Sequence, residues 1–284
     1  MTSVDNIKSA LARIASQADE AIDVAEAALV LASVDHPASD LAIYRDHLKD
    51  IAEGVHAAAV DAEIDTANPA PEDMVRVINK VLVEDFRYAG DEETYDDLDN
   101  ANFMRVIERR RGLPVAIGIL YIHAARAMGW GAAGLNFPGH FLIRLESRDG
   151  RRLIIDPFHG GRPMETQSLR ELLKLVRQDA GAELEAVHYK PVSNREVLIR
   201  LQNNVKTRRM ELNEVNGALE ALSNMQILDP ENAPLWREAG VMHMRLGQLK
   251  NAVEAFEGFV ARAPEGPDRR KIGQVVQELR ERLH

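Results

Sequence analysis

The spacing of apolar residues predicts helices over the first part of the chain. One apolar stripe stops at His36-Pro37 and consists of Ile7, Leu11, Ile14, Ile22, Ala25 and Leu29. A second stripe advances in steps of three and four: Leu41, Tyr44, Leu48, Ile51, Val55 and Ala58. Because such steps place side chains on one face of a helix, we expect two helices here, the second capped by Ser39 or Asp40. A third helix is expected from Glu72-Asp73 onward, since acidic residues suit a helix start.

The middle of the chain contains a polar stretch and then a helix that is apolar nearly all the way round. The polar stretch covers residues 86–101, and a helix is predicted from about Asn102 to Arg111. The next helix begins at Pro114, because proline at the first helical position gives up no hydrogen bond, and Gly129 terminates it. A helix without a polar face belongs inside a fold, so we expect this one to be buried.

Three short runs of strand type follow the apolar helix. They cover residues 132–135, 141–145 and 153–155, and the turn residues Pro138-Gly139 and Asp149-Gly150 separate them. The close spacing around Asp149-Gly150 predicts that the second and third runs pair as an antiparallel hairpin. We therefore expect a small antiparallel sheet.

The tail contains an internal repeat with a period of 34 residues. When residues 217–236 are placed over 251–270, identical residues coincide: Ala218 and Ala252, Glu220 and Glu254, Ala221 and Ala255, Pro230 and Pro264, Glu231 and Glu265. One helix of a unit is expected to turn into the next around Trp236, Ala239, Gly240 and Leu246-Gly247. Small residues inside paired helices, with a proline between units, are typical of tetratricopeptide repeats. Because lone repeats cannot bury their faces, we expect the preceding domain to cap the array.

The composition of the chain excludes several classes of binding partner and of catalytic site. The net charge of −10, from 35 basic and 45 acidic residues, opposes binding to phosphate backbones, so we expect no nucleic-acid partner. No apolar run reaches the roughly 20 residues that a membrane helix needs, and the N-terminus lacks the features of a signal peptide. The chain has no cysteine, which excludes disulfides, zinc–thiolate sites and cysteine nucleophiles. We expect a cytoplasmic protein with no membrane association.

Three segments at the centre of the chain form a recognisable series. They are Arg110-Arg111-Gly112-Leu113-Pro114, then Gly139-His140-Phe141-Leu142, and finally Ile155-Asp156-Pro157-Phe158. A glycine-led buried helix, a strand histidine and an aspartate on the next strand, in this order, resemble the transglutaminase-like superfamily with its papain-type core. More narrowly, residues 70–284 resemble the bacterial SirB family, in which a tetratricopeptide tail follows such a core. The resemblance implies that His140 is a base and that Asp156 orients its ring.

The same resemblance points to a residue that this chain lacks. In thiol members of the superfamily the nucleophile lies at the start of the buried helix, where the helix dipole lowers its pKa. Residues 113–118 read Leu-Pro-Val-Ala-Ile-Gly here and offer neither a thiol nor a hydroxyl. The family often has a serine near the position of Ala116, so this chain departs from its relatives there. We therefore do not expect nucleophilic catalysis by the family mechanism.

His140 and Asp156 also allow two other interpretations. They can be a structural pair that joins two strands, which is the interpretation that we favour. They can instead join His159 as ligands of zinc or iron, although no helical pair of histidines supports a metal site. We predict neither a metal nor a cofactor.

The remaining polar residues are expected to be structural. His123 lies within the apolar helix, and we expect it to be a hydrogen-bonded core histidine. The run Arg109-Arg110-Arg111 is expected to pair with the acidic stretch of residues 91–99, or to stay solvated, rather than to bind an anion. That stretch lacks the glycine and the closing glutamate that a calcium loop requires.

Together these observations predict an α+β fold, mainly α, with a papain- or transglutaminase-like core. We divide the chain into an N-terminal helical segment (residues 1–68), a core with the small antiparallel sheet (69–192) and tetratricopeptide-like helical repeats (193–284). The favoured function is a non-catalytic interaction or scaffold protein, of a regulatory kind, whose repeats hold a protein or peptide. The alternative is a hydrolase or amide-bond-processing enzyme of altered, non-thiol mechanism that uses His140 and Asp156. The missing nucleophile favours the first.

Overall fold

The chain folds into two compact units that are not separated in the order of the sequence. A computed structural model describes residues 3–283. One unit consists of residues 18–201, and in the other the residues up to Gln17 join those from Gln202 onward. We call the first the core unit and the second the tail unit.

Most of the described chain is helical, and the predicted α+β fold with a majority of helix is confirmed. The α-helices are α1 (Ser3–Ala15), α2 (Val24–Ala32), α3 (Leu41–Asp61), α4 (Pro71–Asn79), α5 (Phe103–Arg109), α6 (Pro114–Ala127), α7 (Thr166–Arg177), α8 (Asn194–Glu211), α9 (Val215–Leu228), α10 (Ala233–Arg245), α11 (Leu249–Arg262) and α12 (Pro267–Leu283). The shorter helices are η1 (Asp19–Ala21), η2 (Lys80–Asp85), η3 (Leu98–Asn100) and η4 (Ala186–Tyr189). The strands are β1 (Ala89–Gly90), β2 (Arg111–Gly112), β3 (Gly131–Gly134), β4 (Ile143–Glu146), β5 (Arg152–Asp156) and β6 (Arg162–Pro163).

The first apolar stripe belongs to two helices, and our prediction of a single helix there was wrong. The chain leaves α1 after Ala15 and begins α2 at Val24. The Asp23 side chain accepts hydrogen bonds from the backbone N–H groups of Ala25 and Glu26, so it caps a new helix where the first was expected to continue. The prediction for α3 is confirmed, because the Asp40 side chain caps it by accepting from the N–H of Ala42.

The predicted antiparallel sheet is present in the core unit. Its strands lie in the order β3-β4-β5-β6 and pair with their neighbours in antiparallel fashion. The hairpin of β4 and β5 aligns Ile143 with Ile155, and Gly150 at its turn has the positive φ of 87° that favours glycine. A separate parallel pair, β1 with β2, holds the polar stretch against the chain just before α6.

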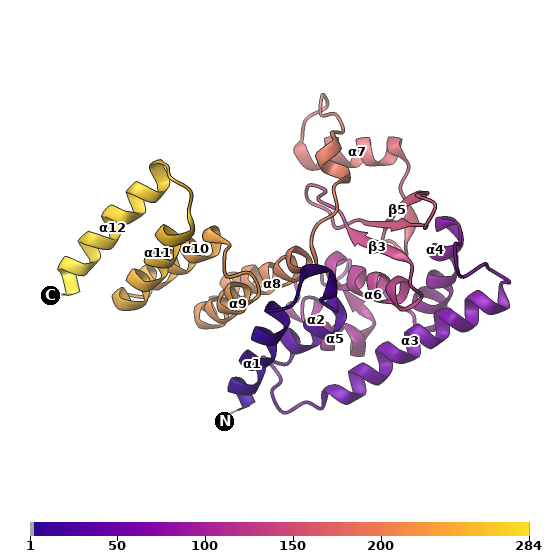
Figure 1. Cartoon of the computed structure of the whole chain (residues 1–284), viewed down its shortest axis with the longest axis horizontal. Helices are drawn as coiled ribbons and strands as arrows, with labels where there is room; N and C mark the ends of the chain where they lie inside the picture. The colour runs from indigo at the N-terminus through magenta and orange to yellow at the C-terminus, as the bar shows by residue number, and fades with distance from the viewer. Residues whose placement is uncertain (1–2, 284) are drawn as a thin grey trace. The chain divides into compact units, whose positions relative to one another are not determined.

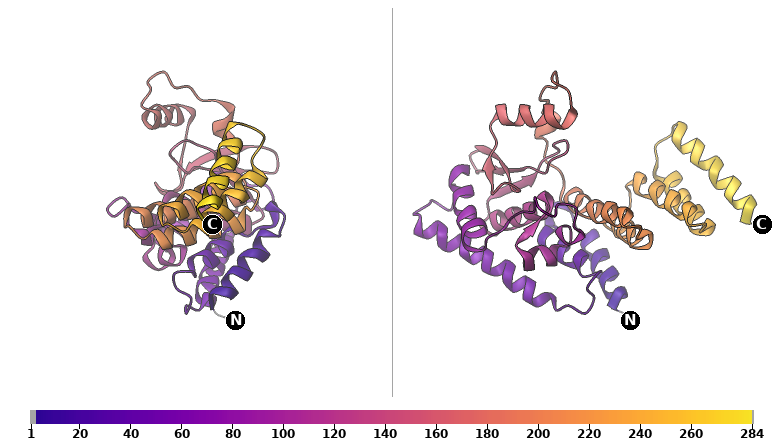
Figure 2. Two further views of the ribbon diagram at one scale, coloured as in Figure 1. Left: turned by 90° about the vertical axis from the view of Figure 1, so that its left-hand side faces the viewer. Right: turned by 180° about the vertical axis from the view of Figure 1, so that it is seen from behind.

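The sheet lies between α6 and α7 (Figures 1 and 2). Helix α6 is buried almost throughout, as its sequence predicts. The helix can approach the sheet closely at Gly118, where a Cβ atom would lie 2.4 Å from the Phe141 ring. On the other face, α7 contributes Leu169 and Leu173 to an apolar cluster with Leu142, the residue before β4. These contacts fix the chain directly after His140.

The tail unit has the repeating helix pairs that the 34-residue period predicts. Ala218 of α9 and Ala252 of α11 are both 0% exposed, and Ala221 and Ala255 are buried as well. Helix α11 packs on α10 and on α12, and α9 packs on α10 (Figure 2). The N-terminal helix α1 packs on α9 and so belongs to this unit. Among residues 3–283, no helix combines the length and the apolar character that a bilayer crossing demands.

Candidate functional site

The sequence-predicted site residues line one pocket of the core unit. His140 precedes β4, and Asp156 is the last residue of β5. Both face a pocket of about 520 Å³, together with His159. Helix α7 forms the opposite wall, where Ser168 is a polar lining residue and Leu175 is exposed. The structure therefore brings His140 and Asp156 to the same place.

Asp156 is hydrogen-bonded to His159 and not to His140. Its Oδ2 atom lies 2.7 Å from Nδ1 of His159, and its Oδ1 atom accepts from the backbone N–H of Phe158 at 3.0 Å. No hydrogen bond joins Asp156 to His140 among the residues that the structure describes. Asp156 is 3% exposed, so its carboxylate is a buried group that orients the His159 ring. On its other side, His159 Nε2 lies 3.6 Å from Oε1 of Glu92.

A tight turn after β5 explains this pairing. The backbone N–H of Gly161 donates to the carbonyl of Asp156 at 2.9 Å and folds the chain back. Gly160 and Gly161 both have positive φ, of 67° and 68°, which the turn requires. A side chain at Gly161 would also collide with Asn79, because a Cβ atom there would lie 2.4 Å from its Oδ1. The turn brings the His159 ring within hydrogen-bond reach of the Asp156 carboxylate.

His140 has an unusual environment for a histidine. Its Nδ1 atom is buried and has no hydrogen-bond partner among the described residues, while its backbone carbonyl accepts from Arg200 at 2.8 Å. Burial lowers the pKa of His140; the nearby Asp156 charge opposes this, and His159 and Arg200 add to it. His140 is therefore a neutral imidazole at neutral pH, able to accept a proton or a hydrogen bond.

The start of α6 carries no nucleophile. Ala116 lies in its first turn and is 0% exposed, so the position of the family serine is filled by a buried methyl group. The nearest hydroxyl that the helix sends toward Asp156 belongs to Tyr121, which donates to Oδ1 of Asn79 at 2.7 Å. Burial and then the Asp156 charge raise the pKa of Tyr121, so the phenol stays protonated and is no nucleophile at neutral pH.

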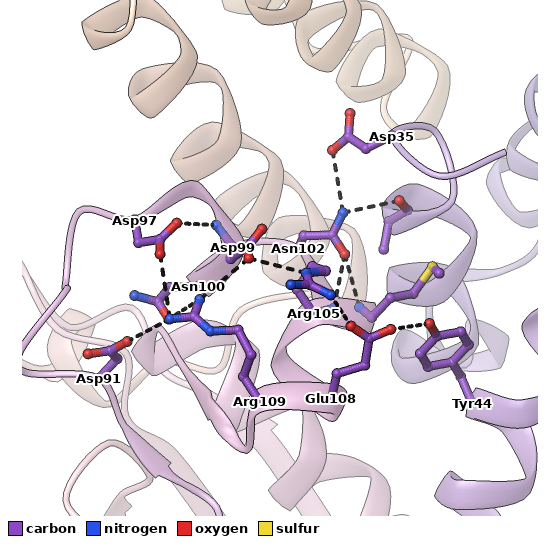
Figure 3. Close-up of polar contacts among 12 residues, drawn as sticks. Asp35, Tyr44, Asp91, Asp97, Asp99, Asn100, Asn102, Arg105, Glu108 and Arg109 are labelled. Atoms are coloured by element: carbon purple, nitrogen blue, oxygen red, sulfur yellow. Dashed lines mark hydrogen bonds and ion pairs between the residues drawn. The ribbon is translucent and has the colours of Figure 1, made fainter. Parts of the chain in front are cut away.

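The acidic stretch is held by arginines of α5 (Figure 3). Arg109 lies 3.3 Å from Oδ2 of Asp91, 3.5 Å from Asp97 and 3.9 Å from Asp99. This confirms the expected pairing for Arg109. Arg110 behaves differently, because its guanidinium lies over the Tyr88 ring, 4.8 Å from the ring centroid.

Asp91 is the buried member of this network. Burial alone would raise the pKa of its carboxyl, but two hydrogen bonds from Thr94 and the charge of Arg109 bring the pKa below its ordinary value. The network therefore keeps the stretch folded beside the pocket, where Glu92 meets His159.

No group of three or more histidine, aspartate and glutamate side chains in the described chain is arranged to hold a metal ion. His140, Asp156 and His159 share a pocket without forming such a group. His123 is hydrogen-bonded as expected, with Nε2 at 2.9 Å from the carbonyl of Leu48.

The pairing of Asp156 with His159 was not predicted, because we considered His159 only as a metal ligand. The signal was available in Asp156-Pro157-Phe158-His159-Gly160-Gly161, because an aspartate followed by a glycine-rich turn readily binds groups a few residues ahead. His159 and His140 can each transfer a proton, but the residues that the structure describes place no activated nucleophile beside them.

Two consecutive regions of the chain match different protein families. Residues 42–203 match the transglutaminase-like superfamily, and residues 206–277 match the tetratricopeptide repeat. A UPF0162 protein of Xylella fastidiosa (strain 9a5c) is 30% identical over 84% of this chain and 83% of its own length. Protein SirB1 of Salmonella typhimurium is 26% identical over 57% of this chain and 60% of its own. The mouse F-box only protein 21 is 29% identical over 45% of this chain and 20% of its own. No solved structure matches the chain.

Proposed function

The chain belongs to the transglutaminase-like superfamily, in a SirB-like family with tetratricopeptide repeats, and from this premise we propose that it is a non-catalytic scaffold protein of a regulatory kind. In this proposal the core of residues 69–192 has lost the family chemistry and the repeats of residues 193–284 hold a partner. The proposed partner is a protein or peptide and not nucleic acid or a membrane, and the proposed location is the cytoplasm.

The start of α6 is the observation that carries the proposal. A histidine and a carboxylate support covalent catalysis only when a nucleophilic side chain lies within their reach. Ala116 has no group that can attack, and the chain has no cysteine that could replace it. The His159 and Asp156 pair then serves to fix the turn after β5 to the neighbouring acidic stretch.

The repeats are the part of the chain that we propose to bind the partner. Tetratricopeptide repeats generally mediate interactions between proteins, because their stacked helices present extended surfaces to a segment of another chain. Helix α10 has exposed apolar residues that its own unit leaves uncovered, with Val241 at 38% and Met244 at 39% exposure. The net charge of −10 also argues against a phosphate backbone as the partner.

Capture from a lysate of the source organism tests the scaffold proposal with full-length variants. The double variant Val241→Asp and Met244→Asp alters exposed positions only, whereas His140→Ala alters the pocket. We expect a specific protein to be retained by the natural chain and by His140→Ala and to be lost with the double variant. Retention that depends on His140 and not on α10 would contradict the proposal.

The alternative, a hydrolase of altered mechanism, rests on the pocket itself. His140 is neutral, Asp156 orients His159, and the hydroxyl of Ser168 lines the same space. A panel of amide and ester substrates distinguishes the two functions. Turnover that disappears in both His140→Ala and Ser168→Ala would support the hydrolase, and its absence in the natural chain supports the scaffold.

A further inference from the structure

The tail unit contains a groove of about 750 Å³. It is bounded by α10, the end of α11 and the start of α12. Its floor is apolar and consists of Ala233, Pro234, Val241, Phe259, Ala263 and Pro264. A space of this size lies within the range of roughly 300–1,000 Å³ that is typical of ligand-binding clefts.

The charges at the rim of this groove decide which partner it suits. Glu238 is paired with Lys206 at 2.5 Å, and Glu265 is paired with Arg269 at 2.8 Å. Asp268 lies in the first turn of α12, where the positive end of the helix dipole compensates a carboxylate. Arg237 is the remaining charged residue of the lining, and it has no ion-pair partner in the described chain.

The face of α10 that carries Arg237 extends beyond the groove and contains further exposed residues of the same kinds. Residues 237, 241, 244 and 245 follow helical spacing, and all are exposed. Arg245, like Arg237, has no ion-pair partner in the part of the chain that the structure describes. The face therefore presents apolar Val241 and Met244 between two uncompensated cations, although the whole protein carries a net charge of −10.

We infer that this groove binds an acidic amphipathic segment of another protein, whose apolar residues fill the hollow and whose carboxylates pair with Arg237 and Arg245. The inference rests on the proposed scaffold function and names the chemistry of its partner. Complementary charge is the reason for choosing an acidic segment, since desolvated arginine–carboxylate pairs both steer binding and discriminate against basic segments.

Selection of random peptides displayed on phage, against the immobilised full chain, tests this inference without knowing the partner. We expect the selected peptides to combine aspartate or glutamate with large apolar residues at helical spacing. Their affinity, measured by fluorescence anisotropy, should fall at least about tenfold in Arg237→Glu. Lys250→Glu is the matched control, because it makes the same charge change at an exposed position of α11 outside the groove.

The outcomes separate this inference from the scaffold function. Peptides that lose affinity in Val241→Asp but are basic or uncharged, or are insensitive to Arg237→Glu, would overturn the acidic partner and leave the scaffold standing. Peptides that bind the natural chain and Val241→Asp equally would overturn the groove itself. Failure to select any peptide would count against both. A dimer in light scattering that dissociates in Arg237→Glu would show that a second copy, not another protein, occupies the groove.

Discussion

His47 illustrates how the core unit holds a neutral imidazole beside a cation. The His47 Nε2 atom lies 2.8 Å from the Tyr88 hydroxyl and 2.5 Å from Nη1 of Arg110. Because the guanidinium can only donate, His47 Nε2 is the acceptor and the ring is neutral. The His47 and Phe86 rings also pack perpendicular to each other, with their centroids 4.8 Å apart. Burial and then the charge of Arg110 lower the pKa of His47 from 6.5 to about 4.

This lowered pKa predicts a loss of stability in acid. The pKa is lower in the folded state, so the stabilisation is complete above pH 6.5 and is lost as the pH falls toward about 4. The free energy of unfolding should fall by at most about 1.4 kcal/mol per pH unit from this one proton. We expect His47→Gln, which keeps an acceptor for Arg110 but does not titrate, to have a shallower slope in urea denaturation between pH 6.5 and pH 5. Comparison at pH 8 isolates the lost contact, and parallel slopes for the two proteins would contradict the assignment.

Two arginines of α5 are expected to contribute differently to stability, because their acidic partners differ in burial. The Asp91 side chain is 7% exposed and faces Arg109, whereas Arg105 and its partners Asp99 and Glu108 are each at least 37% exposed. Arg109→Met leaves a buried carboxylate without its cation and should lower the free energy of unfolding by about 1–3 kcal/mol. Arg105→Met removes surface pairs and should cost about 1 kcal/mol or less. Chemical denaturation measures both, and equal costs would show that burial of Asp91 is not decisive.

Two glycines inside helices of the tail unit predict opposite responses to alanine. A Cβ atom at Gly240 of α10 would lie 2.4 Å from the Phe256 ring of α11, whereas one at Gly273 of α12 would meet nothing within 4 Å. Gly240→Ala should therefore destabilise the protein by about 1–3 kcal/mol through overpacking. Gly273→Ala should stabilise it by up to about 1 kcal/mol, because alanine is the better helix former. Stabilisation in both variants, seen as a higher midpoint of urea unfolding, would mean that α10 and α11 do not pack this closely.

The elements that could be predicted from sequence are those whose signals are local. The apolar residues of α6, its Pro114 and its Gly129 lie within one short segment, and so do the two strands on either side of Gly150. The pairing of β1 with β2 could not be predicted, since two-residue strands have no periodicity to detect. Of the site, the sequence named His140 and Asp156, which line one pocket in the structure, but the partner of Asp156 depends on a turn geometry set by Gly160 and Gly161.

At the scale of the whole molecule, the two units differ in charge and in how the chain builds them. Residues 202–284 contain equal numbers of acidic and basic residues, so the net charge of −10 resides in residues 1–201. Helix α1 is separated from α9 by the entire core unit in sequence and yet packs on it. No local pattern in Ser3–Ala15 reveals a partner so distant, which is why the sequence assigns this helix only to an N-terminal segment. The tail unit therefore combines a helix that precedes the core unit in sequence with helices that follow it.

This arrangement predicts that a cavity in α1 weakens the tail unit and not the core unit. Leu11 of α1 and Leu29 of α2 are both 0% exposed, and each replacement by alanine should cost about 2–5 kcal/mol in the unit that contains it. In native-state hydrogen exchange, Leu11→Ala should speed the exchange of amides in α9 and leave α6 protected. Leu29→Ala should do the reverse, because α2 packs on α6. If Leu11→Ala instead exposes α6 as much as α9, the two units unfold as one and the N-terminal helix has no special tie to the repeats.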